Sequence, residues 1–149
     1  MNPDFLDLLR AFVAADVRFL VVGAYALAIH GRPRATGDLD VWIEATPRNA
    51  SRVWAALEDF GAPLQAIDIS VDDLLQPDRV VQIGLPPRRI DLLTEISGVE
   101  FDDAWTARSE QALGSLQIPF LGRADLVRNK RAAGRRKDLA DLERLGELD

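Results

Sequence analysis

Two aspartates separated by one leucine open a short alternating segment, residues 38–44, and this alternation restricts the stretch to an extended strand. Successive side chains of a strand point to opposite sides, so the two faces of the segment differ. One face carries Leu39, Val41 and Ile43, and the other carries Asp38, Asp40, Trp42 and Glu44. Asp38 and Asp40 therefore point the same way, with Cα atoms about 6.5–7 Å apart. Two carboxylates this close repel each other unless a cation lies between them, and Mg²⁺ is a typical cation for such oxygen ligands.

The length and composition are typical of one globular domain. At 149 residues, 48% of them apolar, the chain can bury a sizeable core, and we expect a single domain over 1–149 in which residues 122–149 form a C-terminal helical segment. The absence of cysteine excludes disulfides, thiol catalysis and iron–sulfur clusters. There is no run of eighteen apolar residues and the N-terminus is acidic, so we expect no membrane span, no signal peptide and a cytoplasmic location.

Helix and strand signals alternate along the chain. Asn2-Pro3 and Thr46-Pro47 each combine an N-cap residue with proline at the first helical position. Periodicity and turn residues predict helices at 3–15, 24–30, 47–60, 71–76, 123–133 and 136–146. Short apolar runs bounded by turn residues predict strands at 18–22, 38–44, 79–83, 89–93, 109–113 and 116–120. The predicted fold class is mixed α/β, with one mixed sheet flanked by helices and further helices at the C-terminus.

Gly23 lies between an apolar strand and a predicted helix. A glycine at such a junction lets the backbone approach a ligand closely, and the N–H groups at the start of the helix can bind phosphate. The pattern is equally that of a plain tight turn without a ligand.

A third carboxylate, Asp91, stands in the apolar run Ile90-Asp91-Leu92-Leu93, where an ionised acid needs a partner. If this strand pairs beside the strand of the two earlier aspartates, the three carboxylates form one cluster able to hold two Mg²⁺. The alternative is an ion pair with Arg88 or Arg89 on an edge strand. The cluster makes phosphoryl or nucleotidyl transfer the first hypothesis.

A family resemblance runs through the segment from Phe19 to Asp40, which reads Phe-Leu-Val-Val-Gly-Ala-Tyr-Ala-Leu-Ala-Ile-His-Gly-Arg-Pro-Arg-Ala-Thr-Gly-Asp-Leu-Asp. The segment resembles the nucleotidyltransferase superfamily related to DNA polymerase β, whose pattern is a glycine turn, then Asp-x-Asp, then a third aspartate on a later strand. It is similar to the branch of AbiEii-type toxins and related small bacterial nucleotidyltransferases, which reads Gly-Gly-x-Ala and then His-Gly-x-x-Arg-x-Thr-x-Asp-Ile/Leu-Asp. The similarity is strong over residues 19–44, moderate at Asp91 and loose in the C-terminal helices.

This resemblance implies transfer of a nucleoside monophosphate from a nucleoside triphosphate to a hydroxyl group, with two Mg²⁺ ions, or Mn²⁺, as cofactors. Asp38 and Asp40 would hold the ion that bridges the nucleotide phosphates. Asp40 and Asp91 would hold the second ion, and Asp91 would also serve as general base. The three aspartates are thus both the catalytic residues and the metal ligands that the resemblance implies.

The resemblance also implies a set of nucleotide-binding residues, namely Gly23, Ala24, Arg34, Thr36 and Lys130. Arg34 and Lys130 would neutralise the charge of the β- and γ-phosphates. Thr36 would orient its loop or contact phosphate. We expect the Lys130 ammonium to project along one edge of the site rather than into the core.

The implied acceptor is a hydroxyl of RNA, including tRNA, or of a protein, and the resemblance adds a toxin–antitoxin role with a cognate antitoxin or toxin as partner. The formal net charge of −6 does not indicate nucleic-acid binding by the chain as a whole. Between positions 123 and 137, however, there are seven basic residues and one acidic residue. Such a cluster either binds phosphates or forms a solvated helix face.

One residue departs from the family pattern. Ala24 stands where serine or glycine is usual, so a hydroxyl contact to phosphate is missing while the backbone N–H remains. The rival interpretation is therefore a catalytically degenerate fold that binds a nucleotide or a partner. His30, the single histidine, is assigned to packing and hydrogen bonding near the loop that follows it, and Trp42 either to the nucleotide pocket or to the core.

Overall fold

The computed structural model describes residues 1–31, 37–85 and 88–147, so Arg34 and Thr36 lie outside the described residues. The elements are α1 (Pro3–Ala14), β1 (Phe19–Val22), α2 (Gly23–His30), β2 (Leu39–Ile43), α3 (Pro47–Phe60), η1 (Val71–Leu75), β3 (Val80–Ile83), β4 (Ile90–Leu93), α4 (Phe101–Thr106), β5 (Ser109–Leu113), β6 (Leu116–Phe120), α5 (Arg123–Ala133) and α6 (Arg136–Arg144). Among these helices, none is both long enough and apolar enough to cross a membrane.

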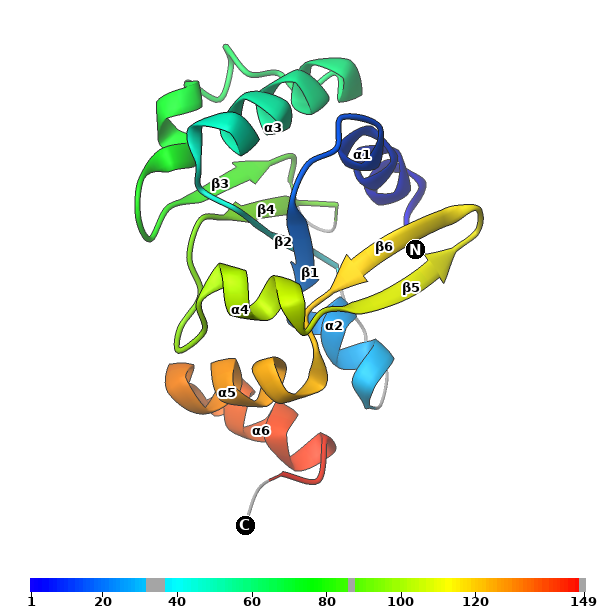
Figure 1. Ribbon diagram of the computed structural model, residues 1–149, viewed down its shortest axis with the longest axis vertical. Helices are drawn as coiled ribbons and strands as arrows, with labels where there is room; N and C mark the ends of the chain where they lie inside the picture. The colour runs from blue at the N-terminus through cyan, green and yellow to red at the C-terminus, as the bar shows by residue number, and fades with distance from the viewer. Residues whose placement is uncertain (32–36, 86–87, 148–149) are drawn as a thin grey trace.

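The strands form one mixed sheet, as the sequence predicts. Its order is β3-β4-β2-β1-β6-β5. The pairs β2–β4 and β1–β6 are parallel, whereas the central pair β1–β2 and the outer pairs β3–β4 and β5–β6 are antiparallel. In Figure 1, α1 and α3 lie together above the sheet and α5 and α6 lie together below it. The mixed α/β fold class with C-terminal helices is therefore confirmed.

The helix α4 was not predicted. Its six residues are too few to show a helical period, and it forms because its apolar side covers the sheet. Phe101 of α4 packs edge-on against Trp42 of β2, with ring centroids 5.0 Å apart. Trp42 is only 2% exposed, so it belongs to the core and not to a nucleotide pocket.

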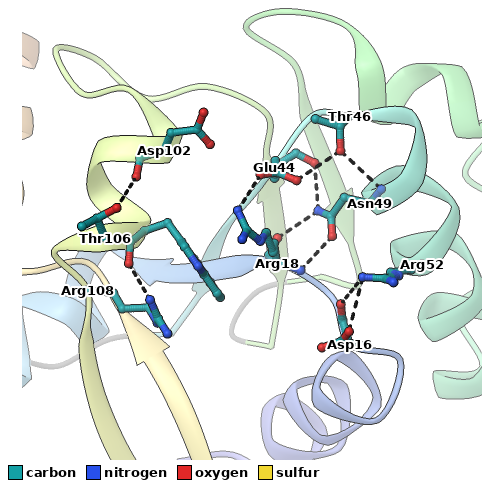
Figure 2. Close-up of polar contacts among 10 residues, drawn as sticks. Asp16, Arg18, Glu44, Thr46, Asn49, Arg52, Asp102, Thr106 and Arg108 are labelled. Carbon is teal, nitrogen blue, oxygen red and sulfur yellow. Dashed lines mark hydrogen bonds and ion pairs between the residues drawn. The ribbon is translucent and has the colours of Figure 1, made fainter.

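The register of β1 on β2 is held at one end by Asn49, which is buried in the first turn of α3 (Figure 2). Its Oδ1 accepts a hydrogen bond of 2.7 Å from the backbone N–H of Arg18, and its Nδ2 donates to the carbonyls of Arg18 and Glu44 at 2.9 and 2.8 Å. The two strands are thereby tied together just before β1 and just after β2. At the other end of this pair Val22 lies opposite Asp40, so the same register sets the position of the carboxylate.

Asn49→Ala is expected to lower the free energy of unfolding by about 2–4 kcal/mol, because it removes three hydrogen bonds of a buried side chain and leaves the Arg18 N–H and the Glu44 carbonyl without this partner. Urea unfolding measures the loss. The matched control is Arg52→Ala on the same helix, which removes a surface ion pair of 3.4 Å to Asp16 and should cost less than about 1 kcal/mol. Equal losses in the two variants would contradict the role given to Asn49.

Candidate active site

The three candidate aspartates come from two neighbouring strands at the centre of the sheet. β2 and β4 run parallel, with Asp40 directly opposite Asp91, and Asp38 immediately precedes β2. The conditional prediction that the strand of Asp91 lies beside the Asp-x-Asp strand is confirmed. Side chains at paired positions of adjacent strands point to the same face, so the fold brings these carboxylates together from positions about fifty residues apart.

Gly23 lies against this cluster. It has a left-handed φ of 67° at the junction of β1 and α2, a conformation that L side chains rarely adopt. A Cβ built on Gly23 would overlap the carboxylate of Asp40. The glycine is therefore required both by the turn and by the approach of the backbone to a carboxylate of the cluster.

Gly23→Ala is expected to displace the Asp40 side chain and to disrupt the nucleotide binding that the sequence predicts, while costing roughly 1–2 kcal/mol of stability through the positive φ. The matched control is Gly114→Ala in the β5–β6 turn, where φ is 63° and no atom lies within 4 Å of the added Cβ. Both variants carry the backbone cost, but only Gly23→Ala should lose the rise in melting temperature expected with a nucleoside triphosphate and Mg²⁺. Loss of that rise in both variants, or in neither, would contradict the close approach.

The pKa of Asp40 reflects the electrostatic environment of the cluster. Burial, together with the negative charges of Asp91 and Asp38, raises the pKa of Asp40 from 3.8 to about 6. The positive charges of Lys137 and Lys130 act in the opposite direction. Burial is the largest cause of this shift, so a cation bound beside the Asp40 carboxylate would lower its pKa.

Arg89 brings a positive charge into direct contact with the cluster. Its guanidinium bridges two of the aspartates, with Nη2 3.0 Å from Asp38 Oδ2 and Nε 2.9 Å from Asp91 Oδ1. The hydrogen bond and the charge of Asp91 raise the pKa of Arg89. The alternative weighed for Asp91, an ion pair with a neighbouring arginine, is thus present, although β4 is an inner strand and not an edge strand.

The donor set fits a hard divalent cation, since three carboxylates converge from adjacent strands and one of them has a raised pKa. Within residues 1–31, 37–85 and 88–147, however, no group of three acidic or histidine side chains is arranged to hold a metal ion in this conformation. Two of the three carboxylates, those of Asp38 and Asp91, are paired with the Arg89 guanidinium.

A cavity of about 860 Å³ opens over the cluster. Its lining includes all three aspartates, Gly23, Ala24 and Lys130. A volume of this size is within the range of small-molecule and cofactor sites. The described residues of the predicted site thus share one cavity, and Arg89 and Lys137 join them although no role was predicted for either.

Lys130 was predicted to project along the edge of the site, and this was wrong. The residue is 5% exposed, and its Nζ lies 3.0 Å from Asp141 Oδ2 and 3.4 Å from Asp138 Oδ1, both on α6. Burial would raise the pKa of Asp138, but hydrogen bonds from Arg135 and the charge of Lys130 hold this pKa below its ordinary value. Lys130 therefore joins α5 to α6 through a buried ion-pair network at the wall of the cavity.

His30 takes no part in the carboxylate cluster. Its Nε2 lies 2.7 Å from the carbonyl oxygen of Leu121, which follows β6. The assignment to hydrogen bonding is confirmed, but the described partner is this carbonyl and not the loop after the histidine.

Comparison with known proteins identifies the fold. No protein-family model and no curated protein matches the chain. Two solved structures share its fold over nearly the whole length. One is TM1012 of Thermotoga maritima, a provisionally assigned nucleotidyltransferase, with a TM-score of 0.61 and 15% identity over 96% of this chain and 92% of that one. The other is the lincosamide antibiotic adenylyltransferase LnuA bound to lincomycin, with a TM-score of 0.63 and 14% identity over 100% of this chain and 98% of that one. The chain thus has a nucleotidyltransferase-like fold.

Proposed function

We propose that this protein is a Mg²⁺-dependent nucleotidyltransferase that transfers a nucleoside monophosphate from a nucleoside triphosphate to a hydroxyl group. The observation that carries the proposal is the pairing of Asp40 with Asp91 on adjacent parallel strands, against Gly23 and at the floor of a cavity. The fold shared with two nucleotidyltransferase structures supports it.

In the proposed reaction the acceptor oxygen forms a bond to the α-phosphorus while the bond from that phosphorus to the α–β bridging oxygen breaks, and pyrophosphate leaves. Asp91 accepts the proton of the acceptor hydroxyl. Asp38, Asp40 and Asp91 would hold Mg²⁺, which when bound would neutralise phosphate charge in the in-line displacement. The backbone at Gly23 and Ala24 receives the phosphates, and Arg34 and Thr36 are proposed to contact them as well.

The finer assignment rests on the motif over residues 19–44. We propose that the chain belongs with the AbiEii-type toxins and related small bacterial nucleotidyltransferases, that it acts in the cytoplasm on a hydroxyl of RNA or protein, and that it works within a toxin–antitoxin pair. Most of the basic residues predicted to serve phosphates are already paired. Arg128 bonds Asp125 at 2.6 Å and Arg135 bonds Asp138 at 2.7 Å, so the helical cluster gives an RNA acceptor less support than its composition suggests.

A second candidate is a nucleotide-binding module without transferase activity. Two features favour it. Arg89 pairs with two of the three aspartates and offsets part of their charge without a metal, and Ala24 lacks the hydroxyl that a serine would offer to phosphate. This candidate predicts nucleotide binding with no release of pyrophosphate.

One experiment separates these functions. The purified protein is incubated with Mg²⁺ and each of the four α-³²P-labelled nucleoside triphosphates, together with total bacterial RNA, soluble bacterial protein or lincomycin as acceptor. Label transferred to one acceptor class supports the enzyme and names that class. A rise in melting temperature with a nucleoside triphosphate and Mg²⁺ but no transferred label supports the binding module. Neither label nor a thermal shift with any nucleotide overturns both.

A further inference from the structure

Four described cations line the cavity, and three of them are already engaged. The four are Arg89, Lys130, Arg135 and Lys137. Arg89 bridges Asp38 and Asp91. Lys130 is buried between two aspartates of α6, and Arg135 bonds one of the same pair. A cation that faces a carboxylate at about 3 Å offers little net charge to a ligand.

Lys137 differs from these three. It is the second residue of α6, its side chain is exposed at the cavity wall, and it forms no ion pair within the part of the chain that the structure describes. Its charge also reaches the carboxylate cluster, because among the cations acting on Asp40 it lowers the pKa of that group more than Lys130 does. Lys137 therefore combines three properties: access to the cavity, no ion pair among the described residues, and a charge that reaches the carboxylates.

We infer that Lys137 is the residue of the C-terminal helices that contacts the phosphates of the bound nucleotide, and that Lys130 instead positions α6 so that Lys137 faces the cavity. This inference rests on the proposed function and specifies the binding side of its site. The chemistry is that of a flexible ammonium acting as a point charge on phosphate oxygens. Lys130 acts indirectly, because its ion pairs with Asp138 and Asp141 hold the start of α6 beside α5.

The inference is tested by calorimetry with whichever of ATP, CTP, GTP and UTP raises the melting temperature most in the presence of Mg²⁺. Lys137→Ala is expected to raise the Kd about 10- to 100-fold, as for loss of a hydrogen bond to a charged group. Lys137→Arg should retain most of the affinity. The melting temperature without ligand should change by no more than a few degrees in either variant, because the described interaction of Lys137 is the effect of its charge on Asp40.

The matched control is Arg136→Ala, the preceding exposed residue of α6, which is absent from the cavity lining. It removes the same charge from the same helical turn and should change the Kd less than about threefold, since only the general field of the helix is altered. If Arg136→Ala and Lys137→Ala weaken binding equally, the effect is one of net charge and the assignment to Lys137 is overturned.

Failure of the inference and failure of the proposed function give different results. A wild-type protein that binds a nucleoside triphosphate with Mg²⁺, together with a Lys137→Ala variant of the same affinity, overturns the inference alone. A wild-type protein that binds none of the four nucleotides overturns the proposed function, and the inference with it.

Discussion

Asp40→Asn is expected to reduce nucleotidyl transfer by roughly 10³-fold or more, because Asp40 is the carboxylate shared by both proposed metal sites and several kcal/mol of transition-state stabilisation depend on it. The measurement is transfer of α-³²P label to the acceptor identified for the wild-type protein. The control is Asp59→Asn, an exposed residue of α3, which should keep wild-type activity. Activity retained in Asp40→Asn would exclude the two-metal mechanism.

The same substitution should stabilise the metal-free fold at neutral pH. The pKa of Asp40 is raised from 3.8 to about 6, so the folded state binds a proton more tightly than the unfolded state. Asp40 therefore leaves the free energy of unfolding unchanged below about pH 4. It lowers this free energy progressively between about pH 4 and 6, and by the full amount above about pH 6. Asparagine carries no charge, so Asp40→Asn should gain about 1–3 kcal/mol at pH 7.5 and almost nothing at pH 3.5.

Urea unfolding at these two pH values, with chelator present to remove divalent cations, measures the gain. Asp59→Asn again serves as the control, with no pH-dependent gain expected. A stability gain of equal size at both pH values would mean that Asp40 acts through packing and not through its charge.

Lys130→Met is expected to destabilise the fold by about 3–5 kcal/mol, because it removes the ammonium that is buried between Asp138 and Asp141. Both carboxylates are fully buried, with exposures of 0% and 1%. Such a loss is a large part of the 5–15 kcal/mol typical of a whole domain. The measurement is urea unfolding at pH 7.5.

The double variant Lys130→Met/Asp141→Asn provides the control for this prediction. Removing charge from both sides of a buried pair avoids leaving one ion uncompensated, so the double variant should recover more than half of the lost stability. If Lys130→Met instead keeps wild-type stability and loses nucleotide affinity, Lys130 is a phosphate ligand and its structural role is refuted.

Much of the fold follows from local sequence. The cap-and-proline pairs at Asn2-Pro3 and Thr46-Pro47 begin α1 and α3 where predicted, and the turn at Gly114 separates β5 from β6 at the predicted residues. The alternation in residues 38–44 marks the strand of the two aspartates. These features depend on backbone geometry within a few residues, which side-chain type determines directly.

Both the local sequence and the tertiary structure determine the carboxylate cluster. The sequence by itself identified Asp38, Asp40 and Asp91 as unusual acids next to apolar strand residues. These side chains lie together because β2 pairs with β4, a pairing that the sequence allowed but did not require. Pairing between strands about fifty residues apart is decided by how well the whole sheet and its helices bury their apolar faces.

Only the tertiary structure decided the role of each cation. Arg89, Lys130 and Lys137 are all basic residues near predicted site elements, and nothing in their local sequence distinguishes them. Arg89 bridges two strands, Lys130 is buried against the next helix and Lys137 remains exposed at the cavity. Similarly, α4 is too short to show a period, and it forms over Trp42 through a contact between residues far apart in the chain. The direction of a long charged side chain is set by the carboxylates that folding places around it, because an ionic contact in a poorly hydrated site outweighs local conformational preference.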